Sequence, residues 1–260
     1  MIEGNEIDVT TPSTARIYDF LLDGKDNFAV DREAAARLLE ATPNAKGMAQ
    51  GNRRFMVRAV RALARAGVRQ FIDLGTGIPT SPNVHEVARE IHPGARVVYV
   101  DNDPIVMTHN RALRATPDGV VTIDEDVRRP ARILEHPDVD SLIDFTQPVG
   151  VLCLAVLHFV SDEEDPEQIL ATLRERMVAG SHLVISTTSS EGFSPAEVDA
   201  VTRSYRGATS PLTLRSRERI ERFFDGFELL DPGLVDVFKW RADEPMVDGK
   251  LLAGVARKNS

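Results

Sequence analysis

The chain has 260 residues, of which 42% are hydrophobic, so it is long enough for one large globular domain or for a domain with a lid. It carries 31 basic and 40 acidic side chains, a formal net charge of −9 without a basic stripe, which argues against nucleic acid as the main partner. The longest apolar run, residues 149–160, is shorter than the roughly 18 residues of a membrane span, and the acidic N-terminus lacks the pattern of a secretion signal.

The first 67 residues precede the first convincing strand, and we expect them to form an N-terminal helical cap or lid (residues 1–67). Residues 18–32, YDFLLDGKDNFAVDR, combine aromatic side chains with a polar stretch around a glycine. Residues 32–41 and 45–66 are rich in Ala, Leu, Arg and Glu, which predicts two helices, and Gly67 is placed to end the second.

From residue 68 onward, strands and helices alternate. Five apolar runs predict strands: residues 68–75, 95–101, 119–126, 149–156 and 181–188. Two further candidates lie at residues 227–230 and 251–256. Near-continuous apolar strands are typical of a parallel sheet covered on both faces, so we expect an α/β fold with a doubly wound, mostly parallel sheet over residues 68–260. Ligands bind such sheets at the carboxyl ends of the strands.

Cysteine and histidine usage limits the metal and redox chemistry. Cys153, the only cysteine, lies in a predicted strand, so internal disulfides and a thiolate metal cluster are excluded. The six histidines are scattered over helices and loops without metal-ligand spacing to a carboxylate, so no metal site is expected. These features favour the cytoplasm, with no membrane association, and they leave the oligomeric state open.

The loop after the first predicted strand, FIDLGTGIPTS, is the strongest functional signal. Gly75 and Gly77 lie where the chain leaves the strand, and the absence of a side chain there lets a ligand approach the backbone. Asp101 ends the second predicted strand, where a carboxylate can accept hydrogen bonds from ribose hydroxyls. The pattern indicates an adenine nucleoside.

Two details favour S-adenosylmethionine over a dinucleotide. Asp73 faces the same crevice, where its charge would repel a pyrophosphate but attract the amino group and sulfonium of S-adenosylmethionine. The third glycine of a dinucleotide-binding GxGxxG motif is replaced by Thr80, and Pro79 removes a backbone donor that phosphate binding would use.

These motifs resemble those of class I S-adenosylmethionine-dependent methyltransferases. The resemblance rests on DLGTG, VDND, DEDV and LAVLHF at the ends of successive strands. More narrowly, PSTARIYDFLLDGKDNF, GNRRFMVRAV and FIDLGTGIPTSPNVHEVA resemble a bacterial subfamily long described only as a domain of unknown function. The resemblance implies a seven-stranded Rossmann-like sheet and S-adenosylmethionine as cofactor. Pro79 departs from the family pattern, in which many members have a glycine.

The resemblance also implies roles for individual residues. Residues at the first strand would border the methionine part of the cofactor: Asp73, Gly75, Thr76 and Gly77. The remaining contacts would be Asp101 to the ribose, Asn102, Asp126 and Val127 around the adenine, and Leu154 and Ala155 beside the sulfonium. Asp126 can alternatively cap a helix start.

His158, just beyond the fourth predicted strand, is a candidate general base because an unperturbed imidazole titrates near neutrality. A packed or hydrogen-bonded structural histidine is the alternative. Methyl transfer displaces an already activated leaving group, so positioning alone can supply much of the rate, and a base is needed only for poor nucleophiles.

The segment before the first strand is free to cover the cofactor site as a roof. In that arrangement, Tyr18 and Phe28 would cover apolar ligand surface, while Lys25, Asn27 and Arg53 would reach polar groups, with Arg53 pairing with the methionine carboxylate. The alternative is an N-terminal helix that ends in a polar loop and serves only in packing.

The sequence thus predicts an S-adenosylmethionine-dependent methyltransferase that acts on a small-molecule acceptor at oxygen or nitrogen. Two alternatives stay open: a regulatory or sensor protein that binds the cofactor without transferring methyl groups, and an NAD-dependent oxidoreductase.

Overall fold

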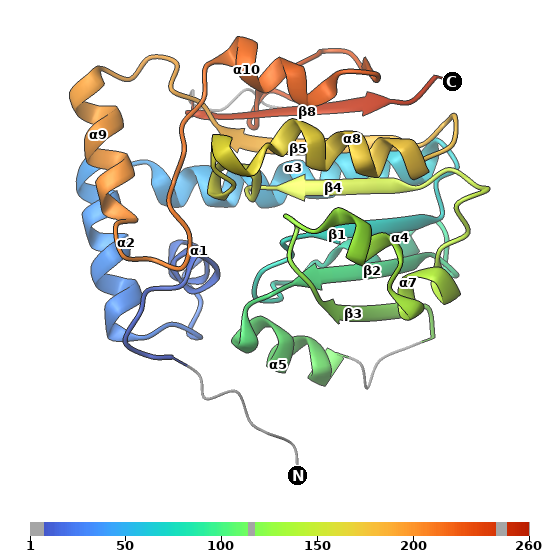
Figure 1. Cartoon of the computed structure of the whole chain (residues 1–260), viewed down its shortest axis with the longest axis horizontal. Coiled ribbons are helices and arrows are strands. Elements are labelled where there is room, and N and C mark those ends of the chain that lie inside the picture. The colour runs from blue at the N-terminus through green and yellow to red at the C-terminus, as the bar shows by residue number, and fades with distance from the viewer. Residues whose placement is uncertain (1–7, 114–117, 243–248, 260) are drawn as a thin grey trace.

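The computed structural model describes residues 8–113, 118–242 and 249–259, and it shows one central sheet with a group of helices at one end (Figure 1). The described strands form an eight-stranded sheet in the order β3-β2-β1-β4-β5-β8-β6, and β7 pairs with β8. Their bounds are β1 Gln70–Leu74, β2 Arg96–Asp101, β3 Val120–Asp124, β4 Gly150–Leu154, β5 His182–Thr188, β6 Glu228–Leu229, β7 Val235–Asp236 and β8 Leu251–Arg257.

The strands from β1 to β5 are parallel, and β8 runs antiparallel to β5. Strand β1 pairs with β2 on one side and with β4 on the other. The direction in which the chain adds strands to the sheet therefore reverses between β1 and β4. This reversal is the switch point at which doubly wound sheets bind ligands. The predicted α/β class, with its mostly parallel sheet, is confirmed.

Helices cover both faces of the sheet. Those outside the cap are α4 Val84–Arg89, α5 Pro104–Leu113, α6 Pro130–Leu134, α7 Pro137–Leu142, α8 Pro166–Arg176 and α10 Arg217–Glu221, with 3₁₀ turns at Leu157–Phe159, Asp162–Glu164 and Arg222–Phe224. Alternate strand residues enter two different cores: Ile72 packs with α6 and α8, whereas its neighbour Phe71 packs with α3 (Ala45–Arg65) and α4. Burial on both faces explains why the strands are continuously apolar.

A third core holds the cap together at the carboxyl ends of the parallel strands (Figure 1). It joins α1 (Thr14–Leu21), α2 (Ala29–Ala41), the start of α3 and α9 (Pro195–Ser204). The later part of α3, from Phe55 to Leu63, packs against the sheet instead. The boundary expected at residue 67 stays a prediction, but the packing adds α9 to the cap and makes α3 a shared element.

The sequence pattern located most elements but not all of them. Helix α4 begins at Val84, and Asn83 and Glu86 form its capping box. The pattern did not single out α7 or β7, which have only six and two residues. Such short elements contain too few positions for a period to be recognised.

Candidate functional site

A cavity of about 290 Å³ lies at the carboxyl ends of β1, β2, β3 and β4, under the cap. Seven segments of the chain meet there, and the residues that line it are Thr14, Ala15, Tyr18, Asn52, Arg53, Met56, Asp73, Gly75, Thr76, Gly77, Asp101, Asn102, Asp103, Pro104, Glu125, Asp126, Val127, Arg128, Leu154, Ala155, Val156, Phe159, Val160, Thr209 and Ser210. Twelve of the fifteen residues expected from the sequence to hold the cofactor are in this set. The three others are Lys25, Asn27 and Phe28.

The loop after β1 presents its backbone to the cavity, as the glycine pattern predicted. Gly75 has a φ of +65° and Gly77 a φ of +68°, a left-handed conformation that glycine adopts without strain. A Cβ atom on Gly75 would stand 2.5 Å from Cγ2 of Val156, so a side chain there would collide with the wall of the cavity. The N–H of Gly77 donates to Oδ2 of Asp101 at 2.8 Å, which joins the loop to the end of β2.

Two buried carboxylates and one guanidinium give the cavity its electrostatic character. Burial raises the pKa of both Asp73 and Asp101 to about 6. Hydrogen bonds oppose that rise: the Thr76 hydroxyl donates to Asp73 at 3.0 Å, and the Asp103 N–H donates to Asp101 at 2.9 Å. The positive charge of Arg53 also lowers the pKa of Asp73. The site therefore favours a ligand that brings positive charge and hydroxyl donors to these carboxylates.

Arg53 lies at the edge of this cavity and also holds the loop that follows β1. Its Nη2 donates to the carbonyl oxygens of Thr80 and, at 2.6 Å, of Pro82. These contacts fix the direction of the guanidinium, while the rest of the group remains on the cavity wall.

Asp126 is held by protein groups at the far side of β2. Asn102 Nδ2 donates to Asp126 Oδ2 at 3.0 Å, and Arg128 forms an ion pair with the same oxygen at 2.9 Å. Arg128 in turn donates to Ser210 Oγ at 3.0 Å, which brings the segment between α9 and α10 to the cavity. An adenine amine at Asp126 would therefore have to share a carboxylate that is already paired.

The end of β4 is connected to the cap by a chain of hydrogen bonds. Ala155, with the left-handed φ of +54°, donates its N–H to Ser186 Oγ at 3.0 Å. The Ser186 hydroxyl donates to Asn52 Oδ1 at 2.6 Å, and Asn52 Nδ2 donates to the Tyr18 hydroxyl at 2.9 Å. The Tyr18 hydroxyl donates to the carbonyl of Ala49 at 3.2 Å. A strained alanine is thus held in place by side chains from β5, α3 and α1.

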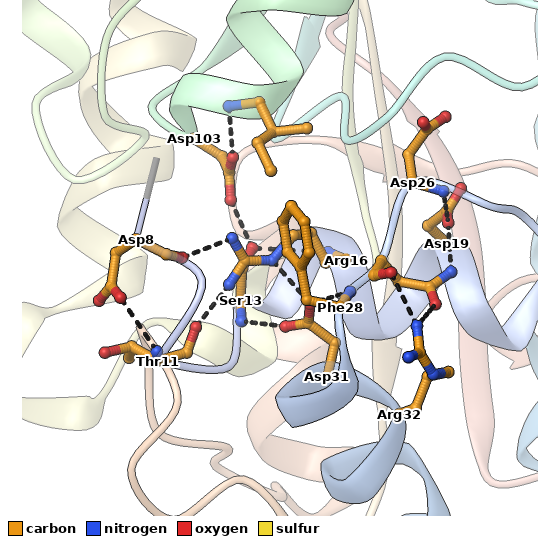
Figure 2. Close-up of polar contacts among 12 residues, drawn as sticks. Asp8, Thr11, Ser13, Arg16, Asp19, Asp26, Phe28, Asp31, Arg32 and Asp103 are labelled. Atoms are coloured by element: carbon orange, nitrogen blue, oxygen red, sulfur yellow. Dashed lines mark hydrogen bonds and ion pairs between the residues drawn. The ribbon is translucent and has the colours of Figure 1, made fainter. Parts of the chain in front are cut away.

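Helix α1 forms part of the cavity wall, and a buried carboxylate holds it there (Figure 2). Asp31 accepts from the N–H groups of Ser13 at 2.9 Å and Phe28 at 2.8 Å, and it forms a buried ion pair with Arg16 Nε at 2.9 Å. The Ser13 hydroxyl donates to Asp103, in the loop after β2. The segment therefore contacts both the cap and the edge of the cofactor cavity, as expected for a roof.

The polar loop of this segment does not reach the cavity, contrary to the expectation for Lys25, Asn27 and Phe28. Asn27 Nδ2 donates to Asp19 Oδ2 at 2.8 Å and so closes the loop on itself. The Phe28 ring, 36% exposed, lies under the Arg16 guanidinium, and Lys25 is exposed. These side chains fold the segment, and among the roof residues of α1 it is Thr14, Ala15 and Tyr18 that line the cavity.

His158 is also placed differently from a general base at the cofactor cavity, whose walls it does not join. Its Nδ1 accepts from the N–H of Thr188 at 3.2 Å, so the proton of the neutral ring is assigned to Nε2. Burial, together with the nearby charge of Arg215, lowers the pKa of His158 to about 3. A ring with its lone pair occupied and so low a pKa is a poor base at neutral pH.

Several cavity residues were not expected from the sequence. Three of them, Asn52, Asp103 and Arg128, lie within or next to a motif that the sequence analysis identified. Their position beside that motif could have predicted them. Thr209 and Ser210 lie in an irregular segment with no pattern of its own, and only the packing of α9 against the cap brings them in. Across the described residues there is no group of three or more His, Cys, Asp or Glu side chains that could hold a metal ion, and no described helix is long and apolar enough to cross a membrane.

The sheet order and the cavity at its switch point define a doubly wound α/β protein that binds its ligand at the carboxyl ends of the parallel strands. The fold is shared with human N-acetylserotonin methyltransferase, solved in complex with SAM, at a TM-score of 0.50 and 13% identity over 89% of this chain and 58% of that one. The chain belongs to the S-adenosyl methyltransferase family, whose sequence profile matches residues 2–259.

Two solved bacterial structures are similar over nearly their whole length. One, from Thermobifida fusca YX and described provisionally as a methyltransferase, is 40% identical, with a TM-score of 0.91 over 97% of both chains. The other, a duf574 family protein from Streptomyces avermitilis MA-4680, is 42% identical, with a TM-score of 0.90 over 96% of this chain and 99% of that one. No curated protein sequence matches the chain. The family assignment confirms the predicted cofactor and disfavours the NAD-dependent alternative.

Proposed function

We propose that this methyltransferase transfers the methyl group to an oxygen or nitrogen atom of a small-molecule acceptor. The observation that carries the proposal is the cavity itself, where α1 closes over two buried carboxylates at the strand ends. An acceptor has to fit between the cap and the sheet, which suits a small molecule better than an exposed site on a macromolecule. The net charge of −9 also disfavours nucleic acid.

The residues that line the cavity suit the parts of S-adenosylmethionine in order. Asp73 would hold the amino group and attract the sulfonium, and Arg53 would face the carboxylate. Asp101 has lone pairs left to accept ribose hydroxyls beside its two backbone donors. Around the adenine would lie Asn102, Val127 and the paired Asp126, and beside the methyl group Leu154 and Ala155.

The cofactor supplies a methyl carbon that its sulfonium already activates. A lone pair on the acceptor oxygen or nitrogen forms the new bond to this carbon while the carbon–sulfur bond breaks and its electrons pass to sulfur, which yields S-adenosylhomocysteine. The proton of the acceptor passes to water. The protein contributes alignment of the two reactants and exclusion of bulk water, which can supply much of the rate.

Affinity for S-adenosylmethionine is expected to rise with pH through about 6, the pKa of Asp73 and Asp101 in the free protein. Below that pH the carboxyls are largely neutral, and above it they are ionised and attract the cationic groups and hydroxyls of the cofactor. Asp73→Asn should weaken binding at neutral pH by about 1.5–3 kcal/mol, the range for a hydrogen bond to a charged group, and should reduce the pH dependence. Calorimetric titrations from about pH 5 to about pH 8 measure both effects.

A matched ligand separates this role of Asp73 from damage to the fold. 5′-Methylthioadenosine has the ribose and adenine but neither the amino group nor the sulfonium, so Asp73→Asn should leave its affinity nearly unchanged. Equal losses for the two ligands would show that Asp73 does not face the methionine part and would overturn the proposed orientation.

A further inference from the structure

A second, smaller cavity lies within the cap, next to the cofactor cavity. It has a volume of about 70 Å³, and Thr14, Tyr18, Ala155 and Phe159 line both cavities. Its other walls come from α1, α2, α3, α9, the segments on either side of α9, and the start of β8. They are mostly apolar: Leu21, Leu38, Ala45, Met48, Ala49, Phe193, Val201, Leu212 and Leu251. Ala155 connects the two spaces at the side proposed for the methyl group.

The walls of the second cavity carry no charged side chain among the described residues. His158, which lies on these walls, is neutral at physiological pH because burial and the nearby charge of Arg215 lower its pKa to about 3. A charged acceptor placed here would lose its hydration without gaining a counter-charge, which is strongly unfavourable. The cavity therefore selects for an uncharged molecule.

One polar side chain that lines this cavity nevertheless has a buried atom without a protein partner among the described residues. The Thr42 hydroxyl is buried and forms no hydrogen bond within the described part of the chain. The Tyr205 hydroxyl belongs to a second polar side chain on these walls. The His158 ring is a third polar group on these walls, and its Nδ1 accepts from Thr188. Buried polar groups are almost always paired in folded proteins, so the unpaired Thr42 hydroxyl at this cavity indicates a ligand that pairs with it.

We propose that this cavity is part of the acceptor site and that the acceptor is an uncharged, mainly apolar small molecule whose end in this cavity is no bulkier than a single ring. This end would pack against the apolar walls, and its polar substituents would meet Tyr205, Thr42 and His158. The atom that accepts the methyl group would lie at Ala155, where the two cavities meet. The inference rests on the proposed function and adds the chemical class of the acceptor to it.

The test uses ring compounds that differ only in charge. The protein is loaded with S-adenosylhomocysteine, and saturation-transfer NMR follows binding of p-cresol, which is uncharged, 4-methylbenzoate, an anion, and 4-methylbenzylamine, a cation. The inference predicts binding of p-cresol and no binding of the two charged compounds. Val201→Trp, which fills the cavity, should abolish p-cresol binding, whereas Ala196→Trp, on the exposed side of α9, should preserve it.

A pair of tyrosine variants keeps the test valid if Val201→Trp fails to fold. Tyr205→Phe removes a hydroxyl from the walls of this cavity, so it should weaken p-cresol binding roughly 2- to 10-fold and leave thermal stability unchanged. Tyr99→Phe removes a buried hydroxyl that contacts His85 Nδ1 at 2.8 Å, outside both cavities, so it should lower stability and leave p-cresol binding unchanged.

The outcomes distinguish the inference from the function on which it rests. If S-adenosylhomocysteine binds but p-cresol does not, or the charged compounds bind equally well, the acceptor site is wrong while the cofactor site stands. If p-cresol binds but Tyr205→Phe and Val201→Trp both leave its affinity unchanged, it binds elsewhere and the inference is overturned. If S-adenosylhomocysteine itself does not bind, the proposed cofactor site fails.

Discussion

Replacing Asp31 with asparagine is expected to detach α1 from the cap and to weaken S-adenosylmethionine binding. The Asp31 carboxylate is fully buried and holds the N–H groups of Ser13 and Phe28 together with the buried guanidinium of Arg16. Asparagine keeps the shape of the side chain but leaves Arg16 without its counter-charge. Breaking a buried ion pair on one side costs about 3–5 kcal/mol, a large part of the stability of a domain.

The loss should concentrate in the cap, because the cores on the two faces of the sheet do not include Asp31 or its partners. Hydrogen exchange should become faster in residues 13–31 while β1 and β4 remain protected. Calorimetry should show weaker cofactor binding, since Thr14, Ala15 and Tyr18 leave the cavity wall together with α1.

Asp23→Asn is the matched control for this prediction. Asp23 lies in the same segment and also forms an ion pair, with Lys46 at 2.5 Å, but its side chain is 64% exposed. Exposed ion pairs contribute little to stability, and asparagine tolerates the left-handed φ of +61° at this position. If both variants keep the cap protected and bind the cofactor normally, α1 does not form a roof over the site.

The floor of the site could be predicted from the sequence because its signals are local. Asp73 and Asp101 end buried strands, and parallel strands bring their carboxyl ends to one edge of the sheet. Gly75 and Gly77 stand where the backbone turns with a positive φ, a conformation that the residue type itself suggests. A strand and the residue that follows it are enough to place these groups.

The roof could be predicted only in part because its arrangement depends on distant contacts. The residue types Lys25, Asn27 and Phe28 are compatible both with contact to a ligand and with a folded loop. The hydrogen bond from Asn27 to Asp19, which the sequence does not reveal, places Asn27 in the loop. Tyr205 and Ser210 lie about 200 residues from α1 in the sequence, and the cap core joins α9 to α1 only in the folded chain. The sequence predicted His158 as a base because it does not reveal the burial of the ring or its hydrogen bond with Thr188, both of which arise from tertiary packing.

Asp101→Ala is expected to weaken cofactor binding by about 1–3 kcal/mol, the cost of leaving the ribose hydroxyls without their acceptor. The substitution also removes the acceptor for the N–H groups of Gly77 and Asp103, so a loss of affinity alone would not identify the contact. Asp124→Ala, at the paired position on β3 and exposed, should change nothing and controls for removal of a carboxylate at a strand end.

A chemical double-mutant cycle separates the ribose contact from disturbance of the loop. The affinities of wild type and Asp101→Ala are measured for S-adenosylhomocysteine and for its 2′,3′-dideoxy analogue. If Asp101 holds the ribose hydroxyls, the wild-type protein should lose affinity for the analogue, while Asp101→Ala should bind both ligands equally, because the two removals act on one interaction. Losses that simply add would mean that Asp101 only shapes the loop through Gly77, and the ribose would have to be placed elsewhere in the cavity.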